Sequence, residues 1–193
     1  MWTRQILGTD VYHLVSWFIL YSMLGWLVES IYMSFCNKKI TNRGFAKGPF
    51  CPIYGFGALG AYYILQPMSG HFIGLYISGA VLATFFEYLV ARLMDRVFGE
   101  VWWDYSDKPF NYKGIICLES TIAWGFYTVM LFGFLQNFIM HLSNRVSMTI
   151  GLRICKFVLV IFALDFGSQL ARALKKSFSE RYLEKFDIYF RRN

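Results

Sequence analysis

Five long apolar runs dominate this sequence and constrain its fold more than any other feature. They cover residues 11–35, 50–68, 71–93, 114–141 and 149–173, and a helix needs about 20 largely apolar residues to cross the hydrocarbon core of a bilayer. Only 16% of the residues are charged, against about 25% in soluble domains. The sequence therefore predicts an all-α, multi-pass membrane protein, with about five transmembrane helices in a domain formed by residues 1–173.

The second run is the weakest of the five. It is short, it opens with Pro49 and Pro52, and it carries the glycines Gly55, Gly57 and Gly60. Proline suits the first turn of a helix but disfavours a regular helix further in. The sequence leaves open whether this run is continuous or re-entrant.

Basic residues predict the orientation, because cytoplasmic loops retain Lys and Arg. Fifteen of the 19 follow the first, third and fifth runs, and the other side collects only Arg4, Arg145, Arg153 and Lys156. We therefore expect an outside N-terminus and a cytoplasmic C-terminus. The net charge of +7 then lies beside anionic lipid headgroups, so it requires no nucleic-acid partner.

A basic tail, residues 174–193, follows the last apolar run. Its apolar side chains recur at helical spacing, with Lys and Arg on the remaining faces; they are Leu174, Phe178, Tyr182 and Phe186. This pattern is typical of an amphipathic helix that lies on the inner leaflet of a membrane. A helix docked on the cytoplasmic loops is the alternative.

Four carboxylates interrupt the apolar runs, and they are the candidate site: Glu29, Glu87, Glu119 and Asp165. An acid at the centre of a membrane helix costs about 2.5–3.5 kcal/mol, and in the predicted topology all four lie in the cytoplasmic half. Structural ion pairing would relieve this cost, and so would a polar cavity that uses the acids for a substrate or a proton. We favour the cavity, because ionisable residues within the membrane are candidates for functional sites.

Two loops on the predicted cytoplasmic side carry polar residues that could gate such a cavity or contact an anion. Asn42 and Arg43 lie in the first loop, where the planar guanidinium of Arg43 suits a carboxylate or a phosphate. Asp104 and Asn111 lie in the loop before the fourth run. The entry to the second run is marked by Pro49, Pro52 and Tyr54.

The sequence carries no pattern for a metal, a nucleotide or a catalytic nucleophile. Its four cysteines form no CxxC pair, and its three histidines fall at the predicted outer ends of the runs, so we expect no metal and no other cofactor. Residues 55–60 match GxGxxG, but without a preceding strand they indicate close helix packing instead of a dinucleotide site. The P-loop motif is absent, so nucleotide hydrolysis by this chain is not expected and an enzyme is the less favoured interpretation.

A combination of motifs in the loops and helix ends resembles one bacterial family. It consists of Gly25-Trp26 followed by Glu29, Asn42-Arg43-Gly44-Phe45, Gly48-Pro49, Pro52-Ile53-Tyr54-Gly55, Trp103-Asp104-Tyr105-Ser106, Pro109, Asn111, Gly114 and Trp124-Gly125. Over residues 11–134 the sequence resembles the ABC-transporter permease family called CmpB-like, or type IV. The resemblance implies a transport protein in the bacterial cytoplasmic (inner) membrane.

We therefore predict a protein that moves a small solute or a lipid-linked molecule through a polar cavity lined by the four carboxylates. Five helices are few for enclosing a complete transport pathway. We therefore expect a homo-oligomer or another membrane subunit as a partner, besides the phospholipid bilayer. A separate ATPase is a further candidate partner. The alternatives are a membrane-embedded enzyme that acts on a phosphate-bearing lipid, and an assembly partner of another membrane protein.

Overall fold

The computed structural model describes residues 2–42, 44, 45 and 47–192, with side chains up to residue 176. Helices make up 73% of the chain, so the fold is mostly helical, as predicted. Strands β1 and β2 pair antiparallel in one short hairpin. In chain order the elements are β1 (Gln5–Ile6), β2 (Thr9–Asp10), α1 (Val11–Asn37), α2 (Pro52–Leu65), η1 (Gln66–Met68), α3 (Phe72–Phe98), α4 (Leu118–Met130), η2 (Leu131–Leu135), α5 (Gln136–Asn144) and α6 (Met148–Arg192).

Among the described residues, three helical segments are long and apolar enough to cross a membrane. They are α1, α3 and the segment Leu118–Asn144, which runs from α4 through η2 to the end of α5. They correspond to the first, third and fourth predicted spans. The second predicted span corresponds to α2, which has 14 residues and continues into η1, and the fifth lies within α6. The count of five spans and their orientation remain predictions.

Local sequence explains where these helices begin and end. Asp10 caps α1, because its side chain accepts a hydrogen bond from the backbone N–H of His13 at 3.0 Å. Pro52 lies in the first turn of α2, where its fixed φ angle favours helix initiation. Gly99 ends α3 with a φ of 77°, a left-handed conformation that glycine adopts without strain.

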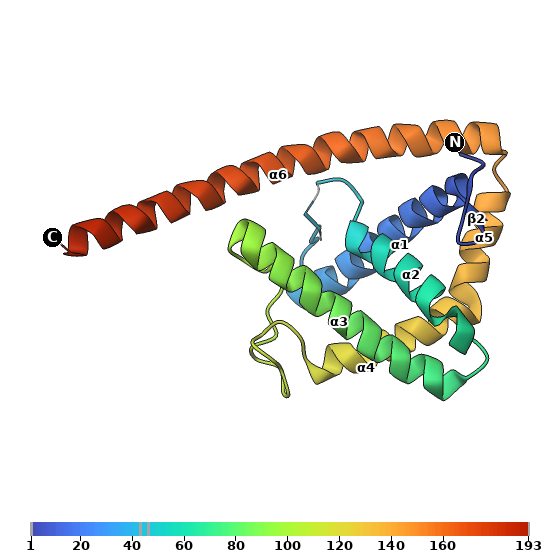
Figure 1. The fold of residues 1–193 in the computed structure, drawn as a ribbon, viewed down its shortest axis with the longest axis horizontal. Helices are drawn as coiled ribbons and strands as arrows, with labels where there is room; N and C mark the ends of the chain where they lie inside the picture. Colours follow the sequence, from blue (N-terminus) through green and yellow to red (C-terminus); the bar gives the residue numbers. More distant parts are fainter. Residues whose placement is uncertain (1, 43, 46, 193) are drawn as a thin grey trace.

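The helices pack as two hairpins, α1 with α2 and α3 with α4 (Figure 1). Glycines lie at these contacts, where a side chain would not fit. In the first hairpin a Cβ atom on Gly25 would overlap the ring of Tyr54, and in the second a Cβ atom on Gly79 would overlap Thr128. Small residues therefore let the helix backbones approach each other closely.

The three glycines of residues 55–60, which we expected to allow close packing, differ in their surroundings. A Cβ atom on Gly55 would overlap Ser22 of α1, and one on Gly57 would lie 3.5 Å from Phe86. Around Gly60, no described residue outside its own turn lies within 4 Å of such an atom. Only Gly55 is therefore required by a tight helix contact.

Helix α6 runs across the hairpins and extends past them at its C-terminal end (Figure 1). It approaches α1 at Gly151, where a Cβ atom would overlap Tyr12. The helix is continuous from Met148 to Arg192, so the predicted tail begins inside it. Side chains beyond residue 176 lie outside the described part of the chain, so the amphipathic face of the tail and the domain boundary at residue 173 stay predictions.

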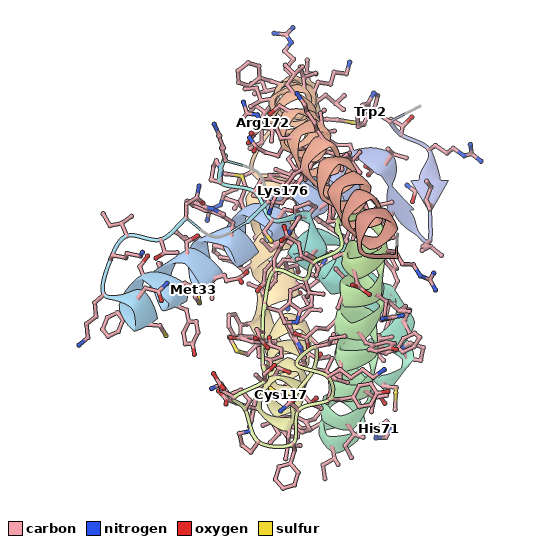
Figure 2. All side chains as sticks on the ribbon, turned by 90° about the vertical axis from the view of Figure 1, so that its left-hand side faces the viewer. Trp2, Met33, His71, Cys117, Arg172 and Lys176 are labelled. Atoms are coloured by element: carbon pink, nitrogen blue, oxygen red, sulfur yellow. The ribbon has the colours of Figure 1, made fainter. Side chains whose placement is uncertain are left out.

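Large apolar side chains cover much of the outer surface. Phe35 is 86% exposed and Leu164 is 71% exposed, and Figure 2 places Met33 on the end of α1 that projects beyond the other helices. A soluble protein rarely exposes a large contiguous apolar surface. Together with the three long apolar helices, this surface suits a membrane protein.

Candidate functional site

The most buried of the four predicted carboxylates is Glu87 of α3, whose residue exposure is 6%. Its Oε1 accepts a hydrogen bond from the hydroxyl of Tyr105 at 3.0 Å. Its Oε2 accepts from the indole N–H of Trp124 at 3.1 Å and from the hydroxyl of Ser120 at 3.4 Å. These three partners are uncharged, so hydrogen bonds from neutral donors stabilise this buried acid.

Glu29 of α1 lies near the same group of side chains. The hydroxyl of Tyr54 donates to Oε2 of Glu29 at 2.9 Å, and the Tyr54 ring centroid is 6.4 Å from that of Trp124. Tyr105 lies within electrostatic range of both carboxylates. The structure therefore brings two of the predicted acids together in a carboxylate cluster, which consists of Glu29, Tyr54, Glu87, Tyr105, Ser120 and Trp124.

Four helices and one loop build this cluster. Glu29 comes from α1, Tyr54 from α2, Glu87 from α3, Trp124 and Ser120 from α4, and Tyr105 from the loop 99–117. The two hairpins supply it in similar ways. Cys51 and Cys117 precede α2 and α4, and the third helical residue after each, Tyr54 or Ser120, hydrogen bonds to the glutamate of the preceding helix. The cluster therefore lies where the two hairpins meet.

The loop 99–117 is folded so that Tyr105 points at Glu87. The backbone N–H of Tyr105 donates to the carbonyl of Gly114 at 2.8 Å. Asp104 accepts from the backbone N–H and the hydroxyl of Ser106 at 2.9 and 2.6 Å, and the amide of Asn111 donates to the carbonyls of Ser106 and Lys108. The predicted gate residues Asp104 and Asn111 thus hydrogen bond within the loop and shape it.

Two pKa shifts in this loop follow from its geometry. Burial, followed by the nearby charge of Glu87, raises the pKa of Tyr105 above its usual range, so its hydroxyl stays protonated and donates. Hydrogen bonds from the side chain and then the backbone of Ser106 lower the pKa of the exposed Asp104. Asp104 therefore stays ionised and accepts the two hydrogen bonds from Ser106 that stabilise the turn.

The first loop, residues 38–51, is attached to α1 and α6. Asn42 accepts a hydrogen bond from the indole N–H of Trp26 at 2.6 Å and donates to the carbonyl of Lys47 at 2.8 Å. The predicted cavity residue Asp165 of α6 accepts from the backbone N–H of Gly48 at 2.8 Å. Pro49 is exposed beside it. Arg43, the predicted anion contact, lies outside the described residues.

An aromatic contact joins the two loops. The rings of Phe45 and Trp102 stack with centroids 4.5 Å apart and planes 7° apart. Phe98 of α3 and Phe166 of α6 both contact Phe45, with centroids 5.6 and 4.9 Å away. The loops that flank the carboxylate cluster are therefore packed against each other and against α6.

The fourth predicted acid, Glu119, is in a different environment. Its Oε2 lies 2.8 Å from Nζ of Lys108 in an ion pair whose side chains are 60% and 43% exposed. Such exposed pairs contribute about 0–1 kcal/mol to stability. The structure thus brings Glu29 and Glu87 together, places Asp165 against the first loop, and leaves Glu119 in an exposed ion pair.

Sequence reasoning did not assign site roles to Tyr105, Ser120 or Trp124. Two of them, Tyr105 and Trp124, belong to the motifs that carried the family resemblance, so a signal for them was present. An indole donor inside an apolar run, as Trp124 is, is a candidate partner for a buried carboxylate. Ser120 belongs to none of these motifs, and serine is common near helix starts.

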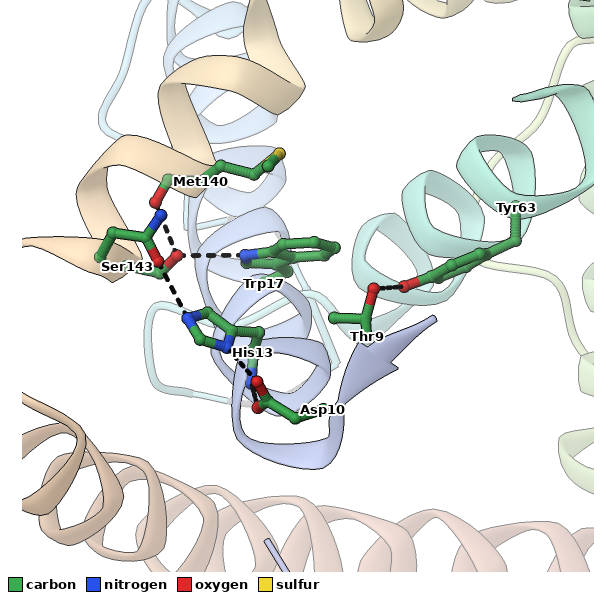
Figure 3. Close-up of polar contacts among 8 residues, drawn as sticks. Thr9, Asp10, His13, Trp17, Tyr63, Met140 and Ser143 are labelled. Atoms are coloured by element: carbon green, nitrogen blue, oxygen red, sulfur yellow. Dashed lines mark hydrogen bonds and ion pairs between the residues drawn. The ribbon is translucent and has the colours of Figure 1, made fainter. Parts of the chain in front are cut away.

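A separate polar group lies at the N-terminal end of α1 (Figure 3). His13 contacts Asp10 through Nδ1 at 2.7 Å and Asn144 through Nε2 at 2.9 Å. The indole N–H of Trp17 donates to the hydroxyl of Ser143 at 3.1 Å. These bonds join the start of α1 to the end of α5, and we interpret them as structural.

Comparison with known proteins gives one family. The family model described as "Putative ABC-transporter type IV" matches residues 16–170. The matched region contains the whole carboxylate cluster and both loops. No curated protein and no solved structure matches the chain.

Proposed function

The chain belongs to the family described as "Putative ABC-transporter type IV", as its loop motifs predicted, and from this premise we propose that it moves a small solute or a lipid-linked molecule across a membrane. The family and the apolar helices are consistent with a membrane transport role. The finer proposal is a polar cavity lined by the buried carboxylates, with the carboxylate cluster at its centre.

The proposal depends mainly on the environment of Glu87. Its residue exposure is 6%, and its partners among the described residues are three neutral donors in place of a cation. A structural ion pair would have a cation as the nearest partner, as Glu119 has in Lys108. A buried acid with neutral donors can exchange a proton or receive a cationic group, which is the chemistry that a transport cavity requires.

The setting and partners of this pathway are also proposals. The setting is the bacterial inner membrane, with an outside N-terminus and five spans. We propose a second copy of the chain or another membrane subunit as a partner, because the helices of one chain are few for enclosing a transport pathway. The family name supports a separate ATPase subunit as the source of energy.

Neutralising Glu87 is the test of this function. In membrane vesicles that contain the chain with its partner subunits and are supplied with ATP, the Glu87→Gln variant is expected to lower uptake at least about tenfold, which corresponds to about 1.4 kcal/mol in the barrier, because the amide keeps the size of the acid but neither its charge nor its proton. Uptake is measured by mass spectrometry of the solutes retained from a mixed pool of small cellular solutes, and proton movement by an entrapped pH-sensitive dye.

The matched control is Glu119→Gln, which neutralises an exposed acid of the same type. It is expected to keep uptake within about twofold of the wild type, because exposed ion pairs contribute little. Unchanged uptake in Glu29→Gln, Glu87→Gln and Asp165→Asn alike would remove the carboxylates from the mechanism. A covalently altered lipid in the vesicles would instead favour an enzyme.

Cys36 gives a test of the proposed orientation. It lies exposed at the end of α1, whereas Cys51, Cys117 and Cys155 are buried. A membrane-impermeant maleimide is therefore expected to label Cys36 in inside-out vesicles and not in right-side-out ones, with Cys36→Ser as the unlabelled control. Labelling of Cys36 from the outer side would reverse the proposed topology.

A further inference from the structure

The loop 99–117 presents aromatic and basic side chains to its surroundings at residues 108–113, which we call the loop tip. Phe110 is 83% exposed and Tyr112 is 51% exposed. Lys113 is exposed as well, and its Nζ lies 5.5 Å from the centroid of the Tyr112 ring. The loop tip therefore combines exposed aromatic rings with a nearby cation.

The backbone of the loop tip is held in an unfavourable conformation. Phe110 and Lys113 have φ angles of 54° and 55°, in the left-handed region that residues with a Cβ atom rarely adopt. The amide of Asn111 fixes this conformation, because it donates to the carbonyl of Lys108 at 2.8 Å and accepts from the backbone N–H of Gly114 at 3.1 Å. Strained backbone of this kind is frequent at binding sites, and here it presents an exposed aromatic ring.

The loop tip lies beside the part of α3 where apolar residues give way to charged ones. The ring centroid of Tyr112 is 6.4 Å from that of Tyr88 in α3. Arg92 follows Tyr88 by four residues, which is about 6 Å along the helix, and Asp95 and Arg96 come next. Before this point an exposed apolar stripe follows one side of α3; it consists of Ile73, Ile77, Val81, Phe85 and Leu89.

This position corresponds to the headgroup level of a bilayer that covers the apolar stripe. Tyrosine, tryptophan and basic residues are enriched at that level in membrane proteins. Lys108 is paired with Glu119 at 2.8 Å, so Lys113 is the better candidate for contact with an outside anion. A bilayer is a better partner for the loop tip than an acidic protein, because the apolar stripe beside it also suits lipid chains.

From these observations we infer that the loop tip binds the headgroup region of an anionic phospholipid. The ring of Phe110 inserts below the phosphates, and the ammonium of Lys113 pairs with a phosphate oxygen. In the proposed orientation this phospholipid belongs to the inner leaflet. The inference rests on the location of the chain in a membrane and not on the proposed transport, so the two can fail separately.

Photocrosslinking from position 110 tests this inference. Phe110 is replaced by p-benzoylphenylalanine, a photoreactive aromatic residue, in the full-length protein. The protein is irradiated in nanodiscs made of equal parts of dioleoyl phosphatidylcholine and dioleoyl phosphatidylglycerol, and also in the membranes of the cells that produce it. Adducts are identified by mass spectrometry. Asp107, an exposed polar residue of the same loop, receives the same substitution as the matched control.

Position 110 is expected to give phospholipid adducts in both settings and position 107 far fewer. In the nanodiscs, phosphatidylglycerol adducts should exceed phosphatidylcholine adducts about fivefold, which corresponds to about 1 kcal/mol for one basic residue near anionic lipid. Adding Lys113→Gln should bring the two lipids close to equal yield. Adding Arg172→Gln, an equal change of charge in α6, should leave the preference unchanged, since Figure 2 shows Arg172 at the opposite end of the view from Cys117, which ends the loop.

Three results would overturn the inference. Lipid yields at position 110 no higher than at position 107 would place the loop tip in water. A protein adduct in place of lipid in the cell membranes would make the loop tip a protein interface. Equal yields of the two lipids without the Lys113→Gln change would remove the preference for an anionic headgroup.

Discussion

Replacing Gly79 with valine is expected to lower the free energy of unfolding by roughly 3 kcal/mol or more, at the upper end of what added side-chain volume costs in a packed core. Even a single Cβ atom at this position would overlap Oγ1, Cβ and Cγ2 of Thr128. Thr128 is only 5% exposed, so it has little room to move. Its hydroxyl also donates to the carbonyl of Trp124 at 2.9 Å, so a shift of Thr128 would disturb the turn that carries a member of the carboxylate cluster.

The Gly60→Ala variant is the matched control. Gly60 is also a helical glycine, but no described residue outside its own turn lies within 4 Å of an added Cβ atom. Alanine in a helix is favoured over glycine by roughly 0.5–1 kcal/mol, so this variant should be as stable as the wild type or slightly more stable. Thermal unfolding in lipid nanodiscs, followed by far-UV circular dichroism, compares the two. Equal melting temperatures for the valine variant and the wild type would contradict the packing of α3 on α4.

The helices whose ends are marked locally were the most predictable part of this fold. The first apolar run predicted 11–35 and α1 is Val11–Asn37, because Asp10 caps the helix and an apolar run follows it. The third run predicted 71–93, but α3 continues to Phe98. Its last turns carry Asp95 and Arg96, so hydropathy ends before the helix does, and Gly99 marks the true end.

The composition of the site was less predictable, because it depends on contacts between distant residues. The acids were visible in the sequence as charges in apolar runs, but nothing local distinguishes Glu87 from Glu119. The loop 99–117 gives these two acids different environments. Its internal hydrogen bonds direct Tyr105 to Glu87, and Lys108 of the same loop reaches Glu119 at 2.8 Å.

The π-helix η2 is another feature that sequence patterns could not predict. The run 114–141 has apolar residues throughout, so one additional residue in a turn leaves its hydropathy unchanged. Its effect is seen in the register of α5 against α1. There the hydroxyl of Tyr21 donates to Oε1 of Gln136 at 2.6 Å, and the indole N–H of Trp17 donates to the hydroxyl of Ser143 at 3.1 Å.

The largest effect on stability is expected from Glu87→Leu. Leucine fills a similar volume, but it leaves the hydroxyl of Tyr105 and the indole N–H of Trp124 without their acceptor, whereas the hydroxyl of Ser120 keeps the carbonyl of Cys117 at 3.0 Å. Each unpaired buried donor costs about 1–3 kcal/mol, and two donors lose their acceptor, so we expect a total loss of roughly 3–5 kcal/mol. Glu87→Gln should lose less, because its carbonyl oxygen can still accept hydrogen bonds.

Two comparisons separate this effect from a general intolerance of leucine. Glu119→Leu breaks only an exposed ion pair and should cost about 1 kcal/mol or less. Tyr105→Phe removes one hydrogen-bond donor. It should lower the free energy of unfolding less in the Glu87→Leu background than in the wild type, because the Tyr105 hydroxyl has already lost its acceptor there. This coupling is read from thermal unfolding of the two single variants and the double variant in nanodiscs. Additive losses would mean that Tyr105 and Glu87 do not interact, and the carboxylate cluster would then lose the contact that ties the loop to α3.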